Sequence, residues 1–536
     1  MRHGSMPQRL IDSQEWRWVF ISSALLLIMI SLPLIWAYAS AVPDRVFMGV
    51  LVNPIDGMSY QAKMIQGYEG SWLFHLPFTP EPHRGVFLFT FYLAMGHLAH
   101  ALNVEPIMIF HVVRLVGGLF MFVALYRFVA DWTDSVEQRR ITWGLAVLGA
   151  GFGWIALTVG RVTPDLLILP EAFPLQAVYA NAHFPWAIAL AVSLAHLLIM
   201  GSLVDPLPWE ETTVPTLSLI AATVALVSIS PFVLAPLAVG YGALCVWLWA
   251  ENSVFPRGPV VWGSTVAIFG LPLALYNAWA ISAQNPVFHE WMRQNVTPSP
   301  PVWDYLIAFG PLLILAAVAI WGSRRYLDAG DAFLLGWMVS TVVFLYLPIG
   351  LQRRFALGLI IPLATYAGRG LWRVLAAAVS RRLRFLVILA AFLSFLPTTI
   401  ITILVPLFGT REVSQGYYYY ISLGEDQAFE WLQQHANDDD VVLASPETSL
   451  FIPAFGPRVV YGHEYETLHP AERKQSVLDY YTGKDCSVTQ RENVNYIIVG
   501  LREKALSGAS TTCLPTGEPI FESSTGDIAI YAAPDR

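Results

Sequence analysis

Long apolar runs, separated by short polar connections, fill the chain up to about residue 410. A helix needs about 20 apolar residues to cross the hydrocarbon core of a membrane. Twelve runs approach that length, namely residues 18–40, 86–104, 107–130, 141–158, 184–201, 216–231, 233–250, 258–280, 304–322, 332–350, 356–377 and 385–408. This pattern predicts a polytopic α-helical membrane protein.

Arginines flank these runs unevenly, and their placement predicts the orientation of the chain. Arg2, Arg9 and Arg17 precede the first run, and a cluster at 381–384 precedes the last one. Positive residues near span ends tend to stay in the cytoplasm. The N-terminus is therefore predicted to be cytoplasmic and the C-terminus extracytoplasmic, and the pair at 324–325 is a further cytoplasmic marker.

Termini on opposite sides require an odd number of spans, so one of the twelve runs does not cross. The run 86–104 is interrupted by Gly96, His97 and His100. We expect this run to be re-entrant or juxtamembrane. About eleven transmembrane helices then remain, and the loop 41–85 lies outside.

Composition and charge separate a membrane domain, predicted at 1–410, from a soluble domain at 411–536. Hydrophobic residues make up 55% of the chain and charged residues 13%, and the mean hydropathy is +0.53. Residues 411–536 carry 19 acidic and 9 basic side chains, against 20 and 22 in the remainder. No basic patch is large enough to grip phosphates, which argues against nucleic-acid binding.

The acidic C-terminal region is predicted to be a small extracytoplasmic α/β domain. Its periodicity predicts helices at 425–435 and 471–481. Strands are predicted at 441–444, 459–461, 496–500, 519–522 and 527–532. Cys486 and Cys513 both fall in this domain, where a single disulfide between them is an open alternative to free thiols.

Asp56 is the candidate catalytic residue in the loop 41–85. It follows Pro54 and directly precedes Gly57, so we expect a turn that presents its carboxylate. In a partly dry site such a carboxylate can act as a general base and take a proton from an attacking hydroxyl. The alternative is a polar connector whose charge has no function.

Polar residues farther along this loop are candidates for substrate binding. The stretch 60–76 can lie along a membrane surface as a short amphipathic helix, and it carries Tyr60 and Lys63. Glu81 and His83 stand just before the next apolar run. Isolated histidines at interfaces are mostly structural, and none is expected to bind a metal.

Arg353 and Arg354 are candidates for binding a phosphate. They stand at the predicted outer end of a span, where the usual distribution of positive residues would not put them. The pair can clamp a phosphate through bidentate hydrogen bonds. Snorkelling to lipid headgroups is the alternative.

Asp165 and Glu171 lie in the loop 159–183, on the same predicted face of the membrane. Convergent carboxylates suit Mg²⁺ or Mn²⁺, so these two residues are the candidate metal ligands. Alternatively, Asp165 caps a helix that begins near Leu166.

The order of these features carries a family resemblance. A cytoplasmic N-terminus, an outer loop with an early Asp and a second Asp after the third span resemble the GT-C fold of membrane glycosyltransferases. That superfamily includes protein mannosyltransferases, aminoarabinose transferase and oligosaccharyltransferase. The C-terminal segments 455–463 and 496–500 are similar to those of uncharacterised bacterial members. Unlike the usual first-loop signature, no second acidic residue accompanies Asp56, and Thr79-Pro80-Glu81-Pro82 replaces a Lys-Pro-Pro element.

The resemblance implies a function and a location. The chain would be an inverting glycosyltransferase of the bacterial inner membrane, moving a hexose or pentose from a polyprenyl-phosphate donor to a lipid, glycan or protein acceptor. Asp56 would be the base or an acceptor-binding residue, and Asp165 the carboxylate of the second outer loop.

Two other classes of function stay open from the sequence. A transporter or lipid flippase would carry polar residues within its spans and repeated halves, whereas the spans here are mostly apolar, with Arg114 and Tyr276 among the exceptions. A catalytically inactive scaffold whose C-terminal domain binds a partner is the other alternative.

A topology reporter tests the predicted orientation. A reporter that is active only in the cytoplasm, fused after Arg536, is expected to give no signal, because one span follows the arginine cluster at 381–384. The same reporter fused after Arg325 is expected to be active and serves as the control. A strong signal from the Arg536 fusion would contradict the orientation.

Overall fold

The computed structural model describes residues 11–203, 209–324, 327–378, 380–411, 418–508 and 512–533. Arg2, Arg9, Arg325 and the segment 412–417, next to the predicted domain boundary, lie outside the described residues. The chain divides into two compact units. Unit 1 consists of Met1–Ser31, Val113–Tyr276 and Thr297–Val405, and unit 2 of Leu32–Val112, Asn277–Val296 and Pro406–Arg536.

Unit 1 is built mainly from helices that are long and apolar enough to cross a membrane. Some of these helices belong to unit 1 only in part. Within the described residues, eight segments meet this condition: Ser13–Ala39 (α1), Pro106–Asp131 (α4), Val136–Thr158 (α5, Val136–Leu148, with α6, Gly153–Thr158), His183–Leu203 (α8), Thr212–Ile229 (in α9, Trp209–Ile229), Pro231–Asn252 (η3, Pro231–Val233, with α10, Leu234–Asn252), Arg257–Ala280 (α11) and Arg381–Gly409 (α17). A ninth is a pair, Val302–Ala308 (α13) and Gly310–Ser323 (α14), bent by 84°.

Two more helices, one of them apolar, complete the match to the predicted spans. Ala329–Phe344 (α15) has 16 residues, and Ile360–Ala377 (α16) has 18 and carries Arg369 and Arg373. The Arg369 guanidinium lies 2.6 Å from the Asp331 carboxylate of α15, so this charge is paired between neighbouring helices. Each of the eleven predicted spans therefore has a helical counterpart, and the prediction of a polytopic helical protein is confirmed.

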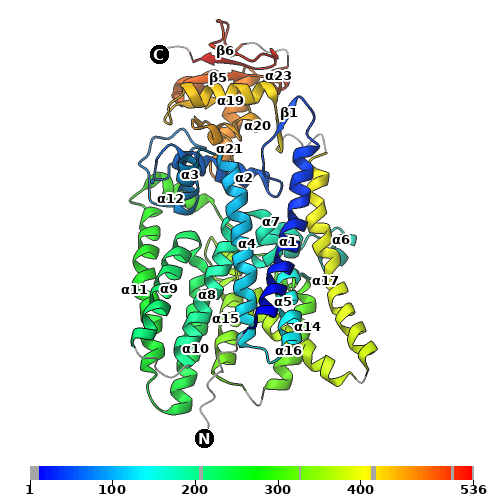
Figure 1. Cartoon of the computed structure of the whole chain (residues 1–536). Helices are drawn as coiled ribbons and strands as arrows, with labels where there is room; N and C mark the ends of the chain where they lie inside the picture. The colour runs from blue at the N-terminus through cyan, green and yellow to red at the C-terminus, as the bar shows by residue number, and fades with distance from the viewer. Residues whose placement is uncertain are drawn as a thin grey trace. The chain divides into compact units, whose positions relative to one another are not determined.

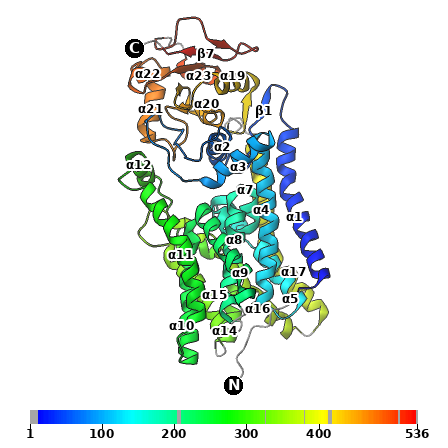
Figure 2. The same cartoon turned by 60° about the vertical axis from the view of Figure 1, so that its left-hand side comes forward.

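The outer faces of these helices are apolar, as lipid contact requires. Along α1 the exposed side chains recur at the spacing of one helix face, namely Ile21, Leu25, Ile28, Leu32 and Ile35. Contiguous exposed apolar surface of this extent marks a membrane-contacting face. Helices within unit 1 pack in pairs, such as α10 against α15 and α14 against α16 (Figures 1 and 2).

The run 86–104 forms a helix that is too short to span. Helix α3, Thr90–Leu102, has 13 residues and belongs to unit 2, where it packs against α2, Pro54–Tyr68. A Cβ on Gly67 or on Gly96 would overlap backbone atoms of the other helix. These two glycines thus permit a close helix crossing, in agreement with the predicted non-spanning segment.

The C-terminal part of unit 2 is an α/β fold around a five-stranded sheet of order β4-β3-β5-β7-β6. Strands β3, β4 and β5 are parallel, whereas β7 pairs antiparallel with β5 and β6. The elements are α19 (Leu423–His435), β3 (Val441–Leu443), α20 (Pro446–Ser449), η5 (Ile452–Phe455), β4 (Arg458–Val459), α21 (Pro470–Tyr481), α22 (Val488–Arg491), β5 (Tyr496–Val499), α23 (Leu501–Ser507), β6 (Phe521–Glu522) and β7 (Ala529–Ala532). The predicted helices and strands of this domain are confirmed.

Alternate residues of the strands enter two hydrophobic cores. Val442 and Ile498 point into one core, while their neighbours Leu443 and Ile497 point into the other, as the two-residue period of a strand requires. Because both faces of the sheet are covered, the strands read as nearly continuous apolar runs.

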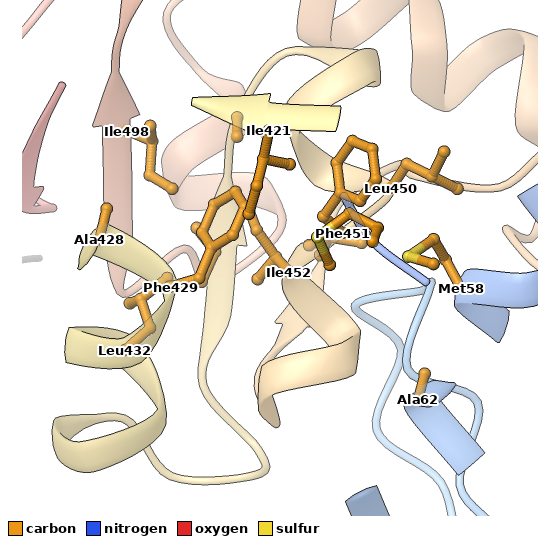
Figure 3. Close-up of a cluster of buried hydrophobic side chains, with 14 of the residues drawn as sticks. Met58, Ala62, Ile421, Ala428, Phe429, Leu432, Leu450, Phe451, Ile452 and Ile498 are labelled. Atoms are coloured by element: carbon orange, nitrogen blue, oxygen red, sulfur yellow. The ribbon is translucent and has the colours of Figure 1, made fainter. Parts of the chain in front are cut away.

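The first of these cores also contains residues from the loop 41–85. Met58 and Ala62 of α2 pack in the same cluster as Leu450, Phe451 and residues of α19, and Figure 3 shows Met58 beside Leu450 and Phe451. In addition, β1 (Arg45–Phe47) pairs antiparallel with β2 (Tyr420–Ser422). The C-terminal domain and the first loop thus share one hydrophobic core. A division at 410/411 separates these two segments.

Cys486 and Cys513 form a disulfide, with Cα atoms 5.2 Å apart. Such bonds persist in oxidising compartments outside the cytoplasm. The disulfide is therefore in keeping with the predicted extracytoplasmic location of this domain.

Candidate functional site

Asp56 lies in the first turn of helix α2. The helix begins at Pro54, after Asn53 in the left-handed conformation with φ 51°. Proline suits this first position because its fixed φ is helical and its missing N–H would have no partner there. Gly57 lies within the helix, and any side chain at this position would overlap Val50. The predicted turn at Asp56 is therefore wrong: the Pro–Gly pair starts a helix.

Asn53 and His463 both approach the Asp56 carboxylate. Asn53 Nδ2 donates a hydrogen bond to Asp56 Oδ2 at 2.5 Å, and His463 Nε2 lies 3.5 Å from Asp56 Oδ1. The Asp56 side chain is 36% exposed, so an acceptor molecule can reach it. The partial positive charge at the N-terminus of a helix favours an ionised carboxylate at this position.

His463 presents a defined tautomer to Asp56. Its Nδ1 accepts a hydrogen bond from the Tyr465 backbone N–H at 3.2 Å, so the ring proton is on Nε2, the atom that faces Asp56. The side chain is only 2% exposed and its ring packs against Phe78. His463 is therefore a buried donor aimed at the candidate base.

The loop that carries His463 is fixed by its own hydrogen bonds. Thr467 Oγ1 accepts from the backbone N–H groups of Gly462 and His463. Gln294, at the end of α12 (Pro286–Gln294), donates to the Thr467 carbonyl and accepts from the His469 N–H. A Cβ on Gly462 would press on the Ser449 carbonyl at 2.6 Å. These contacts set the position of His463 before any substrate binds.

Farther along the same face of α2, Lys63 forms a buried ion pair. Lys63 Nζ lies 2.6 Å from Glu466 Oε1, and the Ser59 hydroxyl accepts from Lys63 and donates to the same carboxylate oxygen. The Lys63 side chain is 1% exposed, and its ammonium lies over the rings of Phe74 and Phe89. Burial raises the pKa of Glu466, but the Lys63 ammonium and the hydrogen bonds from Lys63 and Ser59 outweigh it and hold that pKa below its usual range.

Tyr60 and Lys63 stand differently with respect to substrate binding. The Tyr60 ring stacks on Tyr92 with centroids 4.5 Å apart and is partly exposed beside Asp56 in sequence. Lys63 would have to leave Glu466 in order to contact a substrate. The predicted role of Tyr60 and Lys63 in substrate binding stays a prediction.

Glu81 and His83 both contact other parts of the protein. Glu81 Oε1 lies 2.5 Å from Arg473 Nη2; burial raises its pKa, but Thr79 and Arg473 lower it overall. His83 Nε2 accepts from the Leu76 N–H at 2.9 Å and its Nδ1 donates to the Glu81 carbonyl. Burial lowers the pKa of His83 to about 4. The predicted role of both residues in substrate binding stays a prediction.

In unit 1, Asp165 is buried and its carboxylate is fully engaged. Oδ2 accepts from the backbone N–H groups of Gly151 and Gly153 at 2.9 and 3.1 Å, and Oδ1 accepts from Thr163. Gly153 begins α6, Gly153–Thr158, so Asp165 satisfies the start of that helix instead of capping one near Leu166. Burial raises its pKa, although these donors oppose the shift.

Arg353 and Glu171 come into one neighbourhood of unit 1. Glu171 lies in η2 (Pro170–Ala172), which packs against η4 (Gln352–Ala356). The Tyr305 hydroxyl contacts the Ser299 hydroxyl at 3.3 Å. Arg353 Nε is buried and has no hydrogen-bond partner among the described residues. Arg354 is partly exposed in the same turn.

The candidate metal ligands do not form a ligand set. Both Asp165 oxygens already accept hydrogen bonds from the protein. Across the described ranges, no group of three or more His, Cys, Asp or Glu side chains is placed to hold a metal ion. These residues therefore do not fit Mg²⁺ or Mn²⁺, and no step is derived through a metal.

The structure thus brings together Asp56, Tyr60 and Lys63 on one helix, and Arg353, Arg354 and Glu171 in the other unit. Sequence reasoning missed His463 and Glu466. A signal was present, because Asp56, Ser59 and Lys63 share one helix face by their spacing. A lysine on a buried helix face needs a carboxylate as its partner. The C-terminal domain has many acidic residues, so the sequence does not show which of them pairs with Lys63.

Comparison with known proteins decides the fold. No protein-family model matches the sequence, and no curated protein sequence matches it. Among solved structures, ArnT from Cupriavidus metallidurans bound to undecaprenyl phosphate is similar with a TM-score of 0.54, 14% identity and coverage of 97% of this chain and 98% of that chain. Apo ArnT from the same organism gives 0.54 at 12% identity, with the same coverage.

The chain has the GT-C fold. The likeness extends over both units, so it covers the membrane helices and the C-terminal α/β domain together. The resemblance drawn from the order of the spans and the early Asp is confirmed at the level of the fold.

A double-mutant cycle on thermal unfolding tests the buried ion pair. Lys63→Met is expected to lower the free energy of unfolding of the detergent-solubilised protein by about 3–5 kcal/mol, because it leaves Glu466 buried without a counter-charge. Lys63→Met combined with Glu466→Leu is expected to recover most of that loss.

The control is Arg293→Met, which breaks the exposed Arg293–Glu290 pair and should leave the free energy of unfolding almost unchanged, because solvent screens an exposed pair. A Lys63→Met variant no less stable than Arg293→Met would contradict the description of this pair.

Proposed function

We propose that the chain is a glycosyltransferase of the bacterial inner membrane, moving a sugar from a polyprenyl-phosphate donor to an acceptor hydroxyl on the extracytoplasmic side. The observation that carries this proposal is the placement of Asp56 at the start of α2, between Asn53 and His463, within a GT-C fold. The similar ArnT structure contains undecaprenyl phosphate, which favours a polyprenyl-phosphate donor.

The proposed reaction is a direct displacement at the anomeric carbon. Asp56 takes the proton of the acceptor hydroxyl, and the acceptor oxygen forms the new bond to the anomeric carbon with inversion. The bond from that carbon to the phosphate oxygen breaks, and polyprenyl phosphate leaves with the electron pair. General-base assistance of this kind contributes about 10²–10⁴-fold to the rate.

Arg353 and Arg354 are proposed to hold the phosphate of the donor and stabilise the charge that develops on it. The guanidinium of Arg353 has a buried Nε without a partner among the described residues, and a guanidinium matches phosphate geometry through paired N–H groups. Stabilisation of a leaving group by fixed donors is a large contribution to catalysis in a water-poor site.

Substitution of Asp56 tests the proposed base. Asp56→Asn keeps the size and the hydrogen bonds but cannot accept a proton, so turnover is expected to fall by about 10²–10⁴-fold. Donor and acceptor binding should persist, and the acidic limb of the pH–rate profile should disappear.

Asp44→Asn is the matched control, since Asp44 is an exposed residue of the same loop and should leave turnover unchanged. Near-native turnover of Asp56→Asn would refute the mechanism. Loss of the folded protein would instead mean that Asp56 only holds the start of α2.

Substitution of Arg353 or Arg354 tests the phosphate site. Either change to Ala is expected to weaken donor binding by about 1.5–3 kcal/mol, the usual contribution of a hydrogen bond to a charged group. Lys should rescue only in part, because it lacks the planar fork. Donor affinity would be measured by titration. If it is unchanged in both single variants and in the double variant, the two arginines contact lipid headgroups instead of the donor.

A further inference from the structure

We propose that His463 of the C-terminal domain is a positioning residue for Asp56, which makes the loop Gly462–Thr467 part of the glycosyl-transfer site. The inference deepens the proposed function and rests on Asp56 as the base. The C-terminal domain would then take part in the reaction, because one of its side chains sets the orientation of the catalytic carboxylate.

The direction of the His463 donor carries the inference. Because Nδ1 accepts from the Tyr465 N–H, only Nε2 can donate, and Nε2 is buried with no hydrogen bond to any described residue. The nearest carboxylate is that of Asp56, with Oδ1 at 3.5 Å. Buried donors are rarely left unsatisfied. A catalytic hydrogen bond that is long without substrate can tighten in the complex.

Asn53 and His463 approach different oxygens of the carboxylate. Asn53 holds Oδ2 and His463 faces Oδ1, so the two side chains together fix the rotation of the carboxyl plane. A base must present its lone pair toward the acceptor hydroxyl, and small misplacements are costly in rate. His463 would thus limit the carboxylate to one orientation.

The groups packed around His463 leave its Nε2 facing Asp56. Glu466, from the same loop, is paired with Lys63 at 2.6 Å. Phe78 and Tyr465 supply the other ring contacts. The loop is held by Thr467 and Gln294 independently of Asp56, so His463 is in place whether or not substrate is bound.

Three substitutions separate positioning from packing. His463→Gln places an amide N–H where Nε2 lies and retains a donor for Asp56. His463→Asn can still accept from the Tyr465 N–H but does not reach Asp56, and His463→Phe keeps the ring against Phe78 without any donor. His435→Phe is the control, since His435 is an exposed histidine of the same domain.

The measurement is steady-state turnover with a polyprenyl-phosphate sugar, together with its pH dependence. His463→Asn and His463→Phe are expected to lower kcat about tenfold with little change in KM, and His463→Gln to stay within about threefold of the unchanged protein. Removal of a donor disfavours the ionised carboxylate, so the acidic limb should move to higher pH in the Asn and Phe variants only.

Equal kcat and an unmoved acidic limb in the Asn, Phe and Gln variants would overturn the inference, and so would equal losses in all three. Neither result would touch the proposed function, which fails only if Asp56→Asn retains turnover. If His463→Phe does not fold, His463→Asn against His463→Gln gives the same comparison.

Discussion

A buried ammonium determines how unit 2 is assembled. Lys63 lies on the face of α2 that packs into the core, where an unpaired charge would be costly. Glu466 supplies the counter-charge at 2.6 Å, and Ser59 bridges the two. Because Glu466 comes from the C-terminal domain and Lys63 from the first loop, this pair can exist only when the two segments fold together. The Met58 and Ala62 side chains share the resulting core with Phe451.

This assembly also places the candidate chemistry. Asp56 lies two helical turns before Lys63 on α2, and His463 lies in the same loop as Glu466. The ion pair that fixes the loop against the helix therefore brings His463 to the Asp56 carboxylate. In this account, the C-terminal domain supplies the residue that is proposed to position the Asp56 carboxylate.

Much of the fold was predictable because its causes are local. The apolar runs predict the spans by length alone, and strands such as 441–443 and 496–499 follow from short apolar runs bounded by polar residues. The turn expected at Asp56 failed because proline and glycine punctuate helix starts as well as turns. The bend between α13 and α14 was not visible either, since a run of 304–322 reads as one apolar segment.

The site was predictable only in part, for a physical reason. Asp56, Arg353 and Arg354 stand out because charged side chains beside apolar runs are unusual. His463 and Glu466 do not, because a pairing across about 400 residues leaves no mark in local spacing. Glu81 and His83 stand out for the same reason, and their contacts with Arg473 and the backbone could not be foreseen from the sequence.

The central claim is that Asp56 and His463 act as one unit, and a rate cycle tests it most directly. Turnover would be measured for Asp56→Asn, His463→Asn and the double variant under identical conditions. If His463 acts only through Asp56, the double variant is no slower than Asp56→Asn alone, because residues that act as a unit are strongly non-additive. Losses that multiply in the double variant would contradict the account.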